Sequence, residues 1–193
     1  MCKARYGRDS LTRRRVETIL APAREAWHSR PPRVPSGERA QDEETLDNDF
    51  ENATRLVESA IRKLGLDPSA ARTPSAGEGQ AAWTLKRGSA SILVAVTKHE
   101  DEGSTYLRVA SPVVTLPADR SKHEALLREL LELNASGLAN AAFGLMGERV
   151  VVVSERPTAG LDESEAEQMM RHLAAVADTF DDRLEREFGA TRA

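Results

Sequence analysis

The chain has 193 residues, of which 40% are hydrophobic, and its net charge is −4. This length and apolar content favour one domain with its own core over two full domains. No apolar run is long enough to span a bilayer, and no apolar leader follows the N-terminal arginines. The single cysteine, Cys2, excludes an internal disulfide and a thiolate metal cluster. We therefore expect a cytoplasmic protein that does not associate with membranes.

The net charge hides an asymmetry along the chain. Residues 1–39 contain ten Lys and Arg against four Asp and Glu, a net charge of +6. The remaining residues contain 27 − 10 = 17 bases and 31 − 4 = 27 acids, a net charge of −10. A basic arm can hold nucleic acid, but no aromatic interleaving and no helix-turn-helix pattern accompanies these arginines. Nucleic acid is therefore not the expected partner.

Residues 1–44 are expected to form a basic, proline-containing, disordered tail, because they have too few apolar side chains to offset the entropy cost of ordering. The compact domain is predicted over residues 45–189. Its first helix covers residues 46–64, where apolar residues recur every three or four positions, and Gly65 ends it. Residues 67–80 follow neither helical nor strand periodicity and are predicted to form a loop.

Three strands are predicted next, around residues 83–85, 92–96 and 107–109, joined by short polar turns. Pro112 predicts an edge, a bend or a strand end, because proline has no backbone N–H to donate. The alternation assigns one set of apolar residues to a helix-covered face: Trp83, Leu85, Ile92, Val94, Val96, Leu107 and Val109.

A second helix is predicted to begin with a capping box formed by Ser121 and Glu124, and to end near residues 134–137. Its leucines occupy two adjoining faces, which is wider than packing on a single sheet requires. We therefore predict a homodimer, with the leucines of this helix at the interface: Leu126, Leu127, Leu130, Leu131 and Leu133.

The valine run at residues 150–153 predicts an inner strand, paired in a hairpin with residues 141–145. Asp162 and Glu165 have the spacing of a capping box, and a long amphipathic helix follows as far as Gly189. The complete order is helix, three strands, helix, two strands, helix. This order predicts an α+β domain with helices packed on a mainly antiparallel five-stranded sheet.

No catalytic or metal-binding motif emerges from the residues. The four histidines, His28, His99, His123 and His172, have no second ligand at the spacing of a zinc site. A nucleophile elbow, a phosphate-binding loop and a CxxC pair are absent from the sequence. We therefore predict that the protein is not an enzyme and that it uses no catalytic residue, metal or cofactor.

Three stretches carry a family resemblance: TYLRVASPVV at residues 105–114, LLELNASGLANAAFGLMGERVVVVSERP at 130–157, and GLDESEAEQMMRHLAAVADTFDDRLEREFG at 160–189. They resemble the bacterial YbjN-type, type III secretion chaperone-like family, and the similarity extends over roughly residues 46–189. The order of elements derived above also resembles the order in such chaperones. The resemblance implies a non-enzymatic, often dimeric protein that holds or regulates a partner polypeptide.

The basic tail is a departure from the small secretion chaperones, and two other interpretations remain open beside partner binding. One is a regulatory adaptor that uses the tail. The other is a small ligand-binding domain or enzyme without a recognisable motif. The identity of the polypeptide partner does not follow from the sequence.

The second face of the predicted sheet indicates where a polypeptide would bind. This face carries apolar side chains where a solvent-facing sheet usually carries polar ones. A dimer mate, a partner segment or a helix of the same chain would cover it. We interpret four of its residues as candidates for partner binding: Leu93, Ala95, Tyr106 and Ala110.

Overall fold

The computed structural model describes residues 36–74, 77, 79–87 and 90–193. The predicted tail at residues 1–44 thus lies largely outside the described residues. Residues 36–44 are described, and they form the first turns of a helix. The first domain helix therefore begins before Thr45, the position at which the sequence placed the domain boundary.

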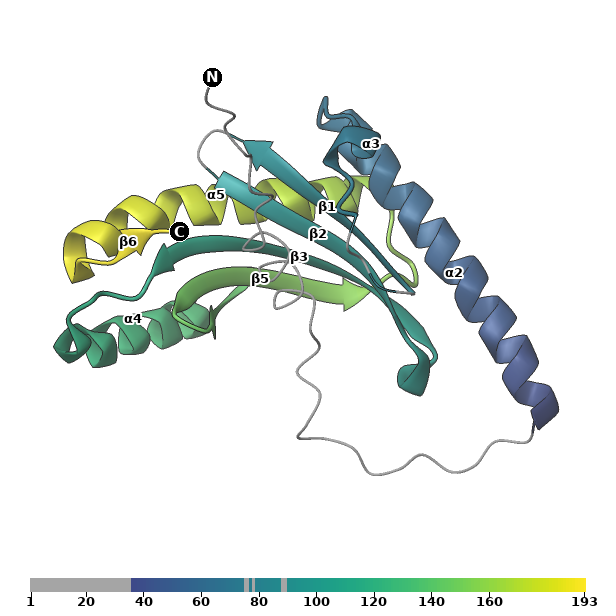
Figure 1. The fold of residues 1–193 in the computed structure, drawn as a ribbon, viewed down its shortest axis with the longest axis horizontal. Helices are drawn as coiled ribbons and strands as arrows, with labels where there is room; N and C mark the ends of the chain where they lie inside the picture. The colour runs from purple at the N-terminus through teal and green to yellow at the C-terminus, as the bar shows by residue number, and fades with distance from the viewer. Residues whose placement is uncertain (1–35, 75–76, 78, 88–89) are drawn as a thin grey trace, which may run out of the picture.

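The elements follow the predicted order with small additions (Figure 1). The helices are α2 (Ser36–Lys63), α3 (Pro68–Ala71), α4 (His123–Ser136) and α5 (Glu163–Phe188). The strands are β1 (Gln80–Arg87), β2 (Ala90–His99), β3 (Ser104–Thr115), β4 (Ala142–Met146), β5 (Arg149–Pro157) and β6 (Thr191–Arg192). Two 3-10 turns, η1 (Glu100–Glu102) and η2 (Arg120–Lys122), precede β3 and α4. None of the described helices is long and apolar enough to cross a membrane.

The strands form one sheet in the order β1-β2-β3-β5-β4, with every neighbouring pair antiparallel. The valine strand, β5, lies between β3 and β4, which confirms the predicted inner strand and its hairpin. Gly147 turns the hairpin with φ 62°, a conformation that glycine adopts without strain. The predicted α+β class with an antiparallel sheet is confirmed.

Two elements were not predicted. The short helix α3 lies within the predicted loop, where the Asp67 side chain accepts a hydrogen bond from the Ser69 N–H and Pro68 provides a preset φ. The two-residue strand β6 pairs with Val114 and Thr115 of β3. Neither element is long enough to produce a periodic pattern, so both escape a reading based on periodicity.

Pro112 does not end its strand. β3 continues from Ser104 to Thr115 between β2 and β5, and the register shifts between Pro112 and Val114. This irregularity is a bulge, which accommodates a residue without an N–H inside a central strand. The bend was among the predicted alternatives, whereas the edge position and the strand end were wrong.

Only one of the two predicted capping boxes forms. Asp162 and Glu165 make both reciprocal hydrogen bonds at the start of α5, at 2.8 and 3.1 Å. The Ser121–Glu124 box was wrong, because the Ser121 hydroxyl and N–H both donate to the Asp119 carboxylate, at 2.7 and 3.0 Å. The Ser121 hydroxyl, followed by the Ser121 N–H, holds the pKa of Asp119 below its ordinary value. Asp119 caps η2 instead, and α4 begins at His123, directly after this 3-10 turn.

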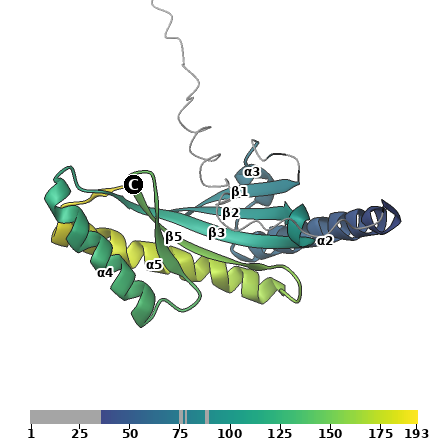
Figure 2. The same cartoon turned by 90° about the horizontal axis from the view of Figure 1, so that it is seen from below.

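The long helices and one face of the sheet form a single core. Apolar side chains of α2, α4 and α5 cluster with the strand residues that the sequence assigned to a helix-covered face, which confirms that assignment. Viewed along the sheet, α4 and α5 lie on the same side of it (Figure 2). The side chains at the centre of this core are fully buried, among them Ile61, Trp83, Leu107, Met170 and Leu173.

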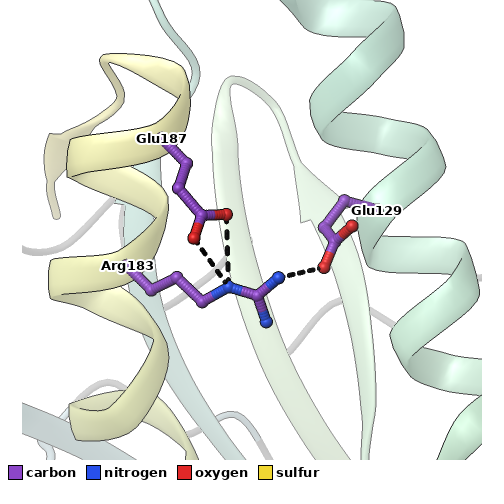
Figure 3. Close-up of polar contacts among 3 residues, drawn as sticks. All are labelled: Glu129, Arg183 and Glu187. Carbon is purple, nitrogen blue, oxygen red and sulfur yellow. Dashed lines mark hydrogen bonds and ion pairs between the residues drawn. The ribbon is translucent and has the colours of Figure 1, made fainter.

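A charged contact joins α4 to α5 above this core. Arg183 of α5 donates from Nε to both carboxylate oxygens of Glu187, at 3.2 Å, and from Nη2 to Glu129 of α4 (Figure 3). The hydrogen bond to Glu187, with the nearby charge of Glu129, raises the pKa of Arg183. One guanidinium thus links two helices that are far apart in the sequence.

Candidate partner-binding surface

The four residues predicted to bind a partner lie on one face of the sheet. Leu93 and Ala110 are direct cross-strand neighbours on β2 and β3. Ala95 lies two residues from Leu93 on the same strand, and Tyr106 lies opposite Thr97 on the same face. The strand register therefore brings all four together. We call this side of the sheet the open face.

The centre of the open face is apolar. Ala82, Leu93 and Ala95 form a cluster separate from the main core and are 0%, 6% and 1% exposed. Ala110 and Val151 extend the same surface toward β5 and are 2% and 3% exposed. Among the described elements, the helices of the main core pack on the opposite side of the sheet (Figure 2). The centre of the open face is therefore buried in the folded chain, although the long helices described here pack on the other side of the sheet.

Arg108 borders this apolar centre. It lies opposite Ala95 on β2 and Glu155 on β5, and its Nη1 lies 3.4 Å from Glu155 Oε2. Its Nε–H is buried and has no hydrogen-bond partner in the described part of the chain. A buried donor without an acceptor costs free energy, which a backbone carbonyl of a bound segment would recover. The sequence analysis missed this residue, although an arginine alternating with apolar neighbours on a predicted strand was the available signal.

Tyr106 lies at the rim of the open face. Its hydroxyl donates to Glu102 Oε2 at 2.8 Å, and its ring lies 4.8 Å from that of His99. This hydrogen bond raises the pKa of the tyrosine, because the anionic phenolate would lose the bond and meet the carboxylate charge. The contacts fix the ring beside η1 and leave it half-buried. Tyr106 therefore supplies a positioned aromatic surface at the edge of the apolar centre.

The five leucines predicted at a dimer interface are divided by the structure. Leu126 and Leu130 are buried in the core of their own chain, and Leu127 and Leu133 pack partly against it. Leu131 is 69% exposed. The other large hydrophobic side chain that the described residues expose is Leu145, at 44%, on the edge strand β4. Leu131 and Leu145 are therefore the large apolar side chains that the described residues leave accessible for association.

The described histidines do not assemble a chemical site. His123 Nε2 lies 2.8 Å from the Pro117 carbonyl oxygen, the His99 ring is tilted by 50° against the ring of Tyr106, and His172 Nε2 is buried without a described partner. Within the described part of the chain, no three His, Cys, Asp or Glu side chains lie close enough to hold a metal ion. His28 lies outside the described residues.

One family model matches most of the chain. Residues 51–193 match the family model described as "T3SS (YopN, CesT) and YbjN peptide-binding chaperone 1". No curated protein sequence matches the chain.

Three solved complexes contain chains similar to this one. The first is the ExsC–ExsE complex, with 16% identity, a TM-score of 0.49, and coverage of 69% of this chain and 93% of that chain. The second is the ExoU–SpcU heterodimer of the type III secretion system of Pseudomonas aeruginosa, with 15% identity and a TM-score of 0.48. The match covers 67% of this chain and 98% of that chain. The third is the HopA1–SchA chaperone–effector complex, with 14% identity and a TM-score of 0.47. The match covers 71% of this chain and 97% of that chain.

Proposed function

This chain belongs to the family of type III secretion system and YbjN peptide-binding chaperones, and on that premise we propose that it holds a polypeptide segment on its open face. As a member of this family it is a partner-binding, chaperone-like module. The specific proposal is the surface. The partner packs against Leu93, Ala95, Tyr106 and Ala110, and its backbone accepts a hydrogen bond from Arg108.

The observation that carries this proposal is the contrast between composition and cover on the open face. Its centre is apolar, it bears a buried arginine N–H without a described acceptor, and the described helices pack on the other side of the sheet. A polypeptide satisfies both requirements at once, because it combines apolar side chains with backbone carbonyls. Binding of this kind needs no catalytic group, so we propose a non-enzymatic role. We separately propose a cytoplasmic location.

We also propose that the protein is a homodimer. Leu131 on α4 and Leu145 on β4 are exposed, and α4 packs beside β4 at one end of the molecule. Exposed side chains of this size are often covered in an assembly, and a twofold axis lets the same surface of two copies meet. Light scattering should give the mass of a dimer at micromolar protein concentration. Leu131→Lys should shift that mass to a monomer, whereas a monomeric wild-type chain would contradict the proposal.

The partner-binding proposal is tested by replacing two residues of the open face. Leu93→Asp with Tyr106→Ser should keep the circular dichroism spectrum of the wild type and lose the polypeptide that co-purifies with it, identified by mass spectrometry. Ser164→Asp is the matched control, because it adds the same charge at an exposed position near the start of α5. Unchanged recovery of the partner by the folded double variant would rule out the open face as the docking surface.

A further inference from the structure

The largest side chain at the centre of the open face, Leu93, is only 6% exposed. Its cross-strand neighbours are Thr84 on β1 and Ala110 on β3, and Ser91 and Ala95 flank it along β2. Side chains stand roughly perpendicular to a sheet, and all four neighbours are shorter than leucine. They therefore do not shield the end of this side chain from water. Its burial requires a layer of atoms above the open face.

The described elements do not form this layer. The helices α2, α4 and α5 pack on the helix-covered face, on the other side of the sheet (Figure 2). After α3 the chain follows the outer edge of β1, where the Thr73 N–H donates to the Ala82 carbonyl oxygen at 2.8 Å, two strands away from β3. The undescribed positions inside the domain, 75–76, 78 and 88–89, hold no large apolar residue. Apolar cover from the same chain must therefore come from residues 1–35.

One stretch of residues 1–35 has the composition of an apolar cover. Residues 11–21, LTRRRVETILA, contain Leu11, Val16, Ile19 and Leu20 and end before Pro22. Val16, Ile19 and Leu20 are three and four positions apart, the spacing that gathers apolar side chains on one side of a helix. Three consecutive arginines precede them in the same stretch. An amphipathic segment of this kind binds by laying its apolar side on an apolar surface.

The length and the charge of the chain before α2 both suit this contact. Residues 22–35 can span about 50 Å when extended, whereas a domain of this size has a radius of gyration of about 15 Å. α2 begins past the η1 end of the sheet (Figures 1 and 2). At that end η1 contributes Glu100, Asp101 and Glu102, and Glu102 accepts the hydrogen bond from Tyr106 of the open face. Residues 1–39 carry a net charge of +6, so the segment is complementary to this acidic rim.

We propose that residues 11–21 pack on the open face of their own chain and occupy it until a polypeptide partner displaces them. The apolar side chains of the segment cover Leu93, Ala95 and Ala110, and its arginines face the solvent and the acidic rim. The family model matches residues 51–193, so this occupant is an addition to the matched domain. The displacement rests on the proposed partner-binding function, whereas the cover itself does not.

Leucine methyl groups of the full chain report the cover in the absence of a partner. The double variant Ile19→Asp with Leu20→Asp should shift the ¹³C-methyl signals of Leu93, assigned with Leu93→Val. The signals of Leu107 on the helix-covered face should stay constant. Both substitutions lie outside the described core, and circular dichroism checks that the fold is kept. Unchanged Leu93 signals in this double variant would overturn the proposal.

The matched control is Ser10→Asp with Ser29→Asp. It adds the same two charges to residues 1–35 without removing an apolar side chain. The Leu93 signals of this control should remain those of the wild type. An equal shift in the control and in the double variant would overturn the proposal, because charge alone would then account for it.

A spin label shows whether the cover belongs to the same chain. With Ala21→Cys in a Cys2→Ser chain, the label should broaden the Leu93 signals and spare those of Leu131, since α4 lies on the other side of the sheet. A spin-labelled chain without isotope is then mixed with an isotope-labelled chain that has no spin label. The Leu93 signals should stay sharp in this mixture. Broadening in the mixture alone would assign the segment to a second copy and overturn the proposal.

Partner affinity tests the displacement. If residues 11–21 occupy the open face about two-thirds of the time, the double variant should bind the co-purifying partner about threefold more tightly, and the control should bind as the wild type does. A Leu93 shift without a gain in affinity would overturn the displacement. If Leu93→Asp with Tyr106→Ser keeps its partner while the spin label reports the cover, the proposed docking surface fails and the cover stands. Failure of the proposed function and failure of the cover are therefore distinguishable.

Discussion

The two faces of the sheet differ in what their side chains pack against. On the covered face, Trp83, Val94, Leu107 and Val109 are fully buried in one cluster with the apolar stripes of α2, α4 and α5. On the open face, small side chains predominate, and the larger Leu93 belongs to a separate cluster with Ala82 and Ala95. Burial of large apolar side chains is the main source of folding free energy. The covered face therefore supplies most of the buried apolar core, and the open face is the surface on which we propose that a polypeptide binds.

On the proposed function, this difference would let the protein bind a polypeptide without a catalytic motif. A face that contributes little to folding is free to be apolar for another reason, namely complementarity to a partner. The Nε of Arg108 is buried on this face without a described acceptor. The following predictions test how far the two faces differ, beginning with the largest expected effect.

Truncation of one leucine on each face should give unequal losses of stability. Leu107→Ala should lower the free energy of unfolding by about 2–5 kcal/mol, because it leaves a cavity in a fully packed cluster. Leu93→Ala should cost less, about 2 kcal/mol at the lower end of that range, because Leu93 is buried in a small cluster with two alanines. Urea unfolding followed by circular dichroism measures both. Equal losses would mean that part of the same chain packs on Leu93 as closely as the helices pack on Leu107.

Removal of the Arg108 guanidinium should weaken partner binding while leaving the fold intact. Arg108→Met keeps the apolar stem but removes the donor, and the affinity for the co-purifying partner should fall about tenfold, the effect of a hydrogen bond from a charged group. Calorimetric titration measures this affinity. Glu155→Gln is the companion variant, since it removes the ion pair at 3.4 Å and keeps the Nε–H donor. If both variants bind as the wild type does, the unpaired donor has no part in recognition.

The link between α4 and α5 belongs to the covered side, so breaking it should affect stability and not binding. Arg183→Met should cost about 0.5–1 kcal/mol, because the guanidinium is partly exposed and its ion pairs are screened. Glu129→Gln removes the contact between the helices, and Glu187→Gln removes the contact within α5. A double-mutant cycle with Arg183 separates the two contributions. Coupling to Glu187 alone would show that the guanidinium does not join the helices in solution.

Deletion of the tail should leave the covered face unaffected. A chain that begins at Ser36 should melt within about 2 °C of the full chain, which corresponds to well under 1 kcal/mol for a domain of this size. A chain that begins at Thr45 lacks the first turns of α2 and serves as the comparison. Differential scanning calorimetry measures both melting temperatures. A larger loss at Ser36 would indicate that residues 1–35 hold the open face more tightly than a displaceable occupant should.

The smallest expected effect is a pH-dependent one at the contact between α2 and α5. The Lys63 ammonium, 3.1 Å from Glu163, and a hydrogen bond from Ser59 hold the pKa of Glu163 below its ordinary value of 4.5. A carboxyl group with a lowered pKa stabilises the fold above its ordinary pKa, and this contribution disappears as the pH falls through the folded-state value. Glu163→Gln should therefore be slightly less stable than wild type at pH 7, and the difference should vanish in acid. A difference that persists unchanged in acid would exclude the charge as its cause.

Local patterns predicted the elements whose signals span many residues. The stripes of α2 and α5 predict helices, and the alternation in β1 to β3 assigns their residues to the correct faces. The capping box of Asp162 and Glu165 was predicted from spacing alone, because both partners lie within one helical turn. At Ser121 the same argument failed. A nearer and charged acceptor, Asp119, takes both donors of the serine, and the spacing pattern does not compare competing acceptors.

The sequence by itself determined the order of the elements, the inner position of the valine strand and the family, because periodicity and capping depend on neighbours along the chain. The tertiary structure alone decided two things: that Leu126 and Leu130 are internal while Leu131 is exposed, and that Arg108 Nε is buried without a described acceptor. These features depend on which distant segments pack together, and residue spacing carries no information about distances between separate elements. Strand alternation placed Leu93, Ala95, Tyr106 and Ala110 on one face, whereas the burial of Arg108 Nε emerges only when the chain is folded.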